Sequence, residues 1–266
     1  MHVLRILLSA ALGMIGLVGC GDTVAAPRRE VSVENHFARE SRRIAADPTG
    51  YLRQLARRCE TLEQYRLTFH RQERLGLIPA LQPMEEIEAI YRRQPHSVKF
   101  LWHDPEDPYC QAVYVQGLND DKLLIRERKG ILFMPPQVRV LDVEIPVQLG
   151  RSKNPITAFG LEQLVNRTLA PFDDPALKDV MTITYEGVVP LEPTGRPAHH
   201  LRITRPPTPG YRYTQQDFYV DAETGWPAGT DLWLENGQLD ARYRYSDVDT
   251  NVTLTDEDFE LGPCPS

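Results

Sequence analysis

Basic residues are in the minority in this sequence of 266 residues, with 30 lysines and arginines against 37 aspartates and glutamates and a formal net charge of −7. A chain without a basic excess does not concentrate on phosphate backbones, which argues against nucleic acid as a partner. Four cysteines are too few for a small scaffold built from disulfides. The sequence also contains no Gly-x-Ser-x-Gly elbow, no His-Glu-x-x-His motif and no phosphate-binding glycine loop. We therefore expect a protein that is not an enzyme and that needs no cofactor or metal.

The composition that is present suits a folded, strand-rich chain. Apolar residues make up 41% of the sequence, which is enough to bury a substantial core. Its 22 prolines and 17 glycines are unusual for a helical bundle, because a proline inside a helix loses a hydrogen bond and clashes with the preceding turn. The chain has no internal repeat at a fixed period and no second domain boundary, so we predict one folded domain over residues 34–266.

Residues 1–19 have the pattern of a secretory signal peptide. His2 and Arg5 lie in a short polar start, an apolar run extends from Ile6 to Val18, and small residues precede a cleavage point. The run has about a dozen residues, whereas a helix that spans a bilayer needs about 20. We predict that this segment is removed and that the mature chain begins at residue 20.

The last residues of the signal and the one after it, Leu17-Val18-Gly19-Cys20, resemble the lipobox of bacterial lipoproteins. The resemblance implies that Cys20 is lipidated, and Gly21 at the next position implies sorting to the outer membrane. Two or more acyl chains hold a protein to a membrane stably where one does not. Residues 20–33 lack apolar periodicity and are predicted to be a flexible tether. The expected location is the periplasmic side of the outer membrane of a Gram-negative-type envelope.

Three further cysteines, Cys59, Cys110 and Cys264, would lie in an oxidising compartment. They permit one disulfide and one free thiol, with three possible pairings between which the sequence does not choose. The chain has no Cys-x-x-Cys spacing that would indicate a redox function. We therefore expect one structural disulfide.

Two segments have the spacing of helices. Asp47-Pro48 is a helix start, with aspartate as the N-cap and proline at the first helical position. Apolar residues then recur at spacings of three and four from Tyr51 to Leu62. A second helical pattern runs from Ile156 to Leu169, and we expect it to stop at Pro171.

The rest of the chain alternates as strands do. Tyr65 to His70, Val98 to His103 and Val113 to Gly117 place apolar residues at every second position. Short turns such as Asn236-Gly237 separate these runs and favour antiparallel pairing. We predict an α+β, mainly β fold: one large curved antiparallel sheet, with about six strands before the mid-chain helix and about five after it. The N-terminal helix and the mid-chain helix would cover its concave face.

Two patterns could suggest a metal site, but both lack an essential feature. His199 and His200 are adjacent, and adjacent residues of a strand point to opposite faces. The segment from Asp247 to Asp258 has the oxygen-ligand spacing of a calcium loop. However, Val252 stands where the glycine of the sharp turn belongs, and Asp258 replaces the bidentate glutamate. We expect no bound metal.

Four segments carry a resemblance to a known family: residues 65–76 (YRLTFHRQERLG), 91–102 (YRRQPHSVKFLW), 113–122 (VYVQGLNDDK) and 154–161 (NPITAFGL). They resemble the bacterial family of domain of unknown function 1571. That family is more remotely similar to the periplasmic lipoprotein carriers and outer-membrane lipoprotein acceptors of the Lol type. The resemblance implies an open half-barrel of about 11 strands, lined with apolar residues and covered by helices. It provides no catalytic or binding residues to transfer.

In such a half-barrel, one face of the strands and the covering helices enclose a cleft for apolar ligands, such as the acyl chain of palmitate. The residues expected to line it are Leu67, Phe69, Phe100, Trp102, Val113, Val115, Phe159, Leu164, Phe218, Val220, Leu232 and Leu234. Glu73 and Arg92 lie in the family-like segments and are candidates for an ion pair across neighbouring strands.

Two functions fit these expectations. The first is a monomeric, membrane-anchored periplasmic lipoprotein that binds or transfers an acyl chain, a lipid or a lipid-modified partner. The second is a non-enzymatic scaffold or interaction protein of the cell envelope, with the same fold and a filled cleft. Lipid extracted from the purified protein would distinguish them, because only the first function predicts a bound lipid.

Overall fold

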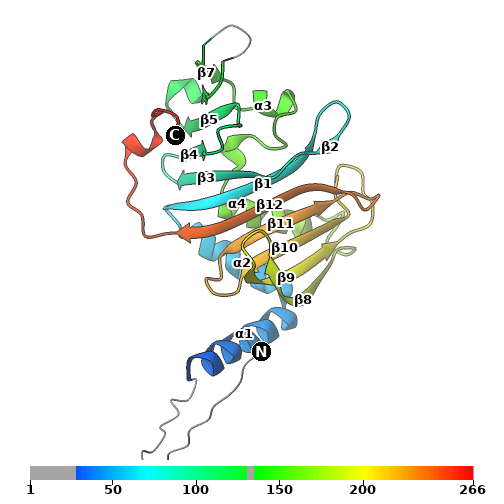
Figure 1. Cartoon of the computed structure of the whole chain (residues 1–266). Helices are drawn as coiled ribbons and strands as arrows, with labels where there is room; N and C mark the ends of the chain where they lie inside the picture. The colour runs from blue at the N-terminus through cyan, green and yellow to red at the C-terminus, as the bar shows by residue number, and fades with distance from the viewer. Residues whose placement is uncertain (1–27, 131–134, 266) are drawn as a thin grey trace, which may run out of the picture.

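The computed structural model describes residues 28–130 and 135–265 (Figure 1). The predicted signal peptide and Cys20 lie outside these residues. The described chain forms one antiparallel sheet of 12 strands that does not close into a barrel, together with 4 helices, and it is 22% helical and 40% strand. The predicted mainly β fold class is therefore confirmed.

The sheet consists of two meanders joined at the middle. Its order is β7-β6-β5-β4-β3-β1-β12-β11-β10-β9-β8, with the two-residue β2 paired to β1. The first and last strands of the chain thus lie side by side at the centre of the sheet (Figure 1). The strands are β1 (Gln64–Leu75), β2 (Ala80–Leu81), β3 (Glu85–Arg92), β4 (Ser97–Trp102), β5 (Tyr109–Val115), β6 (Leu123–Glu127), β7 (Val138–Leu141), β8 (Thr182–Leu191), β9 (Arg196–Thr204), β10 (Gln215–Asp221), β11 (Pro227–Trp233) and β12 (Leu239–Asp249).

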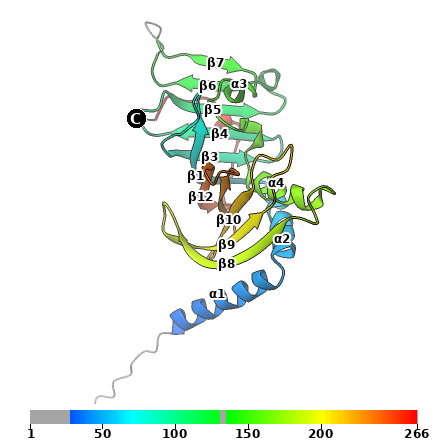
Figure 2. The same ribbon diagram turned by 90° about the vertical axis from the view of Figure 1, so that its right-hand side faces the viewer.

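Helices α2 and α4 lie on the inner side of the curved sheet, whereas α1 extends away from it (Figure 2). The helices are α1 (Arg28–Ala46), α2 (Pro48–Glu60), α3 (Ile145–Gln148) and α4 (Leu161–Asp173), and the short 3-10 turns are η1 (Asn119–Asp121), η2 (Ile156–Ala158) and η3 (Asp256–Phe259). Five strands follow α4, as predicted, and seven precede it rather than six.

Helix α2 begins as its sequence indicates. The side chain of Asp47 accepts a hydrogen bond from the backbone N–H of Gly50 at 2.8 Å, and Pro48 occupies the first turn. Tyr51, Leu52 and Leu55 are buried against the sheet. The period of the apolar residues therefore gave the correct buried face.

Helix α1 begins at Arg28, inside the segment 20–33 that was expected to be a tether. Its sequence has few apolar residues, but it is rich in arginine, glutamate and alanine, which favour helix without a wide apolar stripe. One apolar contact anchors its last turns, because Ile44 is fully buried. The hydroxyls of Ser41 and Tyr185 on β8 also lie within 2.8 Å of each other. Absence of periodicity was thus a poor indicator of a tether here.

The mid-chain helical pattern is divided in two in the structure. The turn η2 ends at Ala158, and α4 begins only after Gly160, whose φ of 144° lies in a region that other residues rarely adopt. Pro171 does not end α4, which continues to Asp173. A proline in the last turn removes one backbone donor and still allows the chain to complete that turn.

Apolar side chains are buried on both faces of the sheet. The main core lies on the concave face, under α2 and α4, and includes Tyr65, Leu67 and Phe218. A smaller core lies on the other face, where the C-terminal segment brings Leu254 and Phe259 against β3 and β5. Strand β5 is therefore covered on both sides.

A disulfide between Cys110 and Cys264 ties this C-terminal segment to β5. It selects one of the three pairings that the sequence left open. Cys59 is free and buried on α2, and burial raises the pKa of its thiol to about 12. The Cys59 thiol therefore stays protonated and chemically inert at neutral pH.

Removing the disulfide by the double substitution Cys110→Ala and Cys264→Ala is expected to lower the free energy of unfolding by about 2–4 kcal/mol. The bridge closes a loop of 154 residues and so restricts the unfolded chain. Guanidinium chloride unfolding measures the loss. As a control, a reductant should destabilise the unmodified protein by a similar amount and leave the stability of the double variant unchanged. Equal stability of the oxidised protein and the double variant would contradict a stabilising effect of the disulfide.

Candidate binding site

A cavity of about 590 Å³ lies between the concave face of the sheet and the segment that includes α4. Its wall is mainly apolar and comes from strands on both sides of the central pair as well as from η2 and α4. Strand residues in the wall include Phe69 on β1, Trp102 on β4 and Tyr245 on β12. Folding therefore leaves an apolar space within the main core.

Five aromatic rings form the centre of this wall. The ring of Phe69 lies 5.2 Å from Phe159, 5.2 Å from Tyr245, 5.9 Å from Phe100 and 6.0 Å from Tyr243, between ring centroids. The rings of Phe100 and Phe159 meet edge to face at 5.0 Å. Aromatic pairs at these separations attract one another beyond their burial of area, so the five rings stabilise one another in the wall.

Strand register explains why these rings meet. Phe69 on β1 is opposite Tyr245 on β12, and Arg71 is opposite Tyr243. Because alternate residues of a strand share a face, Phe69, Arg71 and Glu73 follow one another along the same side of β1. The cavity wall thus changes from aromatic to charged along the direction of β1.

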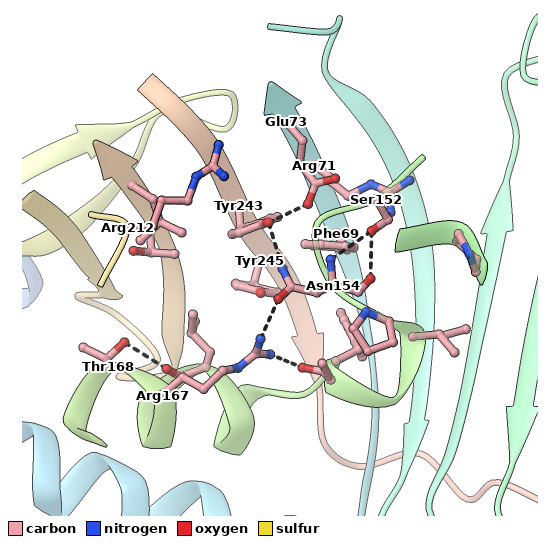
Figure 3. A pocket seen from close by; sticks show the side chains of 18 of the residues that line it. Phe69, Arg71, Glu73, Ser152, Asn154, Arg167, Thr168, Arg212, Tyr243 and Tyr245 are labelled. Atoms are coloured by element: carbon pink, nitrogen blue, oxygen red, sulfur yellow. Dashed lines mark hydrogen bonds between the residues drawn. The ribbon is translucent and has the colours of Figure 1, made fainter. Parts of the chain in front are cut away.

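A chain of hydrogen bonds crosses the cavity from sheet to helix (Figure 3). The hydroxyl of Tyr243 donates to Glu73 at 2.5 Å, and the side-chain amide of Asn154 donates to the Tyr243 oxygen at 3.1 Å. Arg167 on α4 in turn donates to Asn154 at 3.0 Å. Burial and the nearby Glu73 carboxylate hold the pKa of Tyr243 well above its usual range, so its hydroxyl keeps the proton it donates.

The structure places six of the twelve predicted lining residues on the cavity wall. These are Phe69, Phe100, Trp102, Phe159, Leu164 and Leu232. Leu67, Phe218 and Val220 belong to the main core outside this wall, and Leu234 is half-buried in the turn after β11. The side of the strand was correctly predicted for most of them, but the position of the open space was not.

Val113 and Val115 lie on the wrong face for a cleft. They pack in the smaller core under the C-terminal segment, while Ala112 of the same strand lines the cavity. Residues 110–115 of β5 are all buried, so the apolar pattern could not distinguish its two faces. A bulge between Tyr109 and Gln111 further shifts the alternation.

The predicted ion pair between Glu73 and Arg92 is wrong. Arg92 is paired in register with Gln64, nine positions before Glu73 on β1, a separation of about 30 Å at about 3.3 Å per residue. Arg92 instead bonds Asp256 at 2.8 Å. Glu73 is buried and accepts hydrogen bonds from Tyr243 and from the backbone of Lys153.

Several site residues were not anticipated from the sequence. Asn154, Arg167 and Tyr243 form the bridge described above, and the segment 210–213 after β9 adds further wall. The alternation of Tyr243 and Tyr245 with arginines was a usable signal, since it places both rings on one face. No local pattern indicates that residues 210–213 return to the same cavity.

The two histidines considered as metal ligands do point to opposite faces. His199 lies 2.8 Å from the hydroxyl of Tyr185, whereas His200 lies 2.8 Å from Asp217. Over residues 28–130 and 135–265, no group of three or more histidine, cysteine, aspartate or glutamate side chains is arranged to hold a metal. Within the same part of the chain, no helix is long and apolar enough to cross a membrane.

Solved structures with a similar fold include MucB and the lipoprotein LppX. The chain is 17% identical to MucB in the Pseudomonas aeruginosa MucA/MucB complex, over 81% of this chain and 61% of that chain, with a TM-score of 0.46. It is 13% identical to the Mycobacterium tuberculosis lipoprotein LppX, over 79% of this chain and 100% of that chain, with a TM-score of 0.44. The match thus spans less than two thirds of MucB.

Comparison of the sequence with family models assigns the chain to a family, which these distant structural matches do not. No curated protein matches the chain. The family model described as protein of unknown function (DUF1571) matches residues 62–262, which include every strand of the sheet. The chain therefore belongs to the DUF1571 family.

Proposed function

We propose that this protein is a lipoprotein of the bacterial cell envelope that binds an acyl chain, or a lipid-modified partner, in the cavity between the sheet and α4. The observation that carries the proposal is the cavity itself, with its volume of about 590 Å³ and its aromatic wall. Ligand sites in proteins span about 300–1,000 Å³ and are lined mainly by apolar side chains with a few polar groups.

An acyl chain is the ligand that such a wall favours. Each methylene removed from water contributes about 0.8 kcal/mol, so a chain of about sixteen carbons could contribute about 13 kcal/mol before the costs of ordering and association. The aromatic rings around Phe69 are held by one another, so little wall ordering opposes binding. A non-enzymatic scaffold with a filled core has no need of this open volume.

The proposal includes the membrane anchor expected at Cys20 and a location on the periplasmic side of the outer membrane. An acyl chain bound in the cavity would be a removable ligand, distinct from the lipid attached covalently at Cys20. The anchor would keep the folded domain within reach of the membrane, because Cys20 is separated from α2 by a short segment and by the 19-residue α1, which is about 28 Å long. The protein would then act as a carrier or acceptor close to its lipid source.

Filling the entrance of the cavity is expected to abolish most ligand binding. Ala170 lies exposed on α4 and lines the cavity, so Ala170→Trp adds an indole to its wall without disturbing the core. We expect the affinity for a fluorescent fatty acid to fall by at least about tenfold, equivalent to about 1.4 kcal/mol. Titration of the full-length protein by fluorescence measures this change.

The matched control is Ala176→Trp, which places the same side chain on an exposed turn outside the cavity. It should bind the fatty acid as the unmodified protein does. Mass spectrometry of lipid extracted from the purified protein tests the scaffold alternative. A protein that carries no extractable lipid and binds no fatty acid would exclude the proposed function.

A further inference from the structure

The charged residues that line the cavity are almost all of one sign. They are five arginines and one glutamate: Arg71, Arg151, Arg167, Arg205, Arg212 and Glu73. The protein as a whole has a net charge of −7, so this local excess of positive charge runs against its overall balance. A pocket meant only for a hydrocarbon chain needs no arginine.

Two of these arginines have carboxylate partners. Arg71 bonds Glu85 at 2.6 Å, and Arg212 makes two hydrogen bonds with Asp240 at 2.9 and 3.0 Å. The guanidinium of Arg167 donates hydrogen bonds to the side chain of Asn154 and to the backbone oxygens of Ala158 and Gln163. These three side chains therefore already hold the walls of the cavity together.

Arg205 differs from them. Over the described residues it has no carboxylate within ion-pair distance, and its Nε is buried without a hydrogen-bond partner. Its guanidinium lies over the ring of Tyr211, 5.1 Å from the centroid. Burial lowers the pKa of Arg205, which reflects the cost of a desolvated cation without a counter-charge. Arg151, also on the wall, is exposed and likewise has no acidic partner within the described chain.

These side chains lie where the aromatic wall ends. Along β1 the cavity residues run from Phe69 through Arg71 to Glu73. Since all the strands are antiparallel, the end of β9, which precedes Arg205, lies at the same end of the sheet as the start of β12. The Arg212 to Asp240 pair joins these two ends directly. The cavity is thus apolar at one end and basic at the other.

We propose that the basic end is a site for the anionic head group of an amphiphile, a carboxylate or a phosphate, with Arg205 as its principal contact. This assignment rests on the proposed function, because the chain of the same ligand would occupy the aromatic part. The Arg205 side chain lines the cavity and has no acidic partner within the described chain, and a planar guanidinium binds carboxylate and phosphate through two parallel hydrogen bonds.

A pair of ligands that differ only in the head group tests the proposal. The full-length protein with Cys20→Ala, which has no lipid attached at that position, is titrated with 1-palmitoylglycerol 3-phosphate and with 1-palmitoylglycerol, each displacing the neutral reporter N-phenyl-1-naphthylamine. We expect the phosphate ligand to bind at least about tenfold more tightly at low salt, and this preference to shrink as salt screens the charges. Inorganic phosphate, which lacks the chain, should not displace the reporter at the same concentrations.

Arg205→Gln should reduce the preference to about threefold or less while leaving the affinity for 1-palmitoylglycerol unchanged. Arg57→Gln, on the exposed face of α2 outside the cavity, is the matched control and should keep the full preference. Equal binding of both lipids by the unmodified protein, or an unchanged preference in Arg205→Gln, would overturn the head-group site and leave the acyl-chain cavity intact. Binding of neither lipid would overturn both, and displacement by inorganic phosphate alone would replace the amphiphile by a free anion.

Discussion

Replacement of Asp231 by asparagine is expected to lower the free energy of unfolding by about 3–5 kcal/mol, because it leaves a buried arginine without its counter-charge. Asp231 on β11 is 2% exposed and lies 2.7 Å from Arg244, which is 4% exposed. Arg242 donates to the same carboxylate at 3.0 Å. Urea unfolding followed by circular dichroism measures the loss.

An exposed ion pair provides the matched control. Asp256 bonds Arg92 at 2.8 Å, but the side chain of Asp256 is 88% exposed. Asp256→Asn is therefore expected to change the stability by less than about 0.5 kcal/mol, since exposed pairs gain little in high dielectric. The same small effect of both substitutions would contradict the prediction. It would mean that Arg242 and Arg244 do not need the negative charge of Asp231.

Replacement of Cys20 by alanine is expected to move the protein from the membrane fraction to the soluble fraction, or to leave it with an uncleaved signal. The lipobox-like segment implies that this thiol carries the acyl chains, and each buried methylene of those chains contributes about 0.8 kcal/mol to membrane binding. Labelled palmitate incorporated into the unmodified chain should be absent from the variant. Fractionation of cells followed by detection of the protein measures the outcome.

Cys59→Ala is the control, because it removes the buried free thiol and leaves the N-terminal segment intact. This variant should remain in the membrane fraction and incorporate palmitate. Labelled palmitate incorporated into Cys20→Ala as fully as into the unmodified chain would exclude lipidation at this residue. It would not affect the cavity, whose residues all lie in the sheet, α4 and their connections.

The elements predicted with success are those whose pattern depends on one buried face. Helix α2 has a capping aspartate and an apolar stripe, and β1 alternates between the core and a more polar face. In both cases the period alone identifies the buried side. Strand β5 fails this test because its residues 110–115 are all buried, and Val113 was therefore assigned to the wrong face.

The candidate site was only partly predictable for a different reason. Aromatic residues such as Phe69 and Phe100 could be assigned to a shared face by alternation, and both line the cavity. The position of the empty space depends on how α4 and the segments around Asn154 and Arg205 close over that face. These contacts join residues far apart in the chain, and no local preference specifies them.

The sequence by itself determined the mainly β class, the helices α2 and α4 and the family, because periodicity, turns and motifs are local properties. Only the tertiary structure decided the Cys110 to Cys264 pairing, the covered outer face of β5 and the cavity with its arginines. Each of these depends on which distant side chains come together and which remain without a partner. Arg205 is the clearest example. In the sequence it is one arginine among many, and it becomes a candidate ligand contact only because the described structure places it on the cavity wall with no acidic side chain beside it.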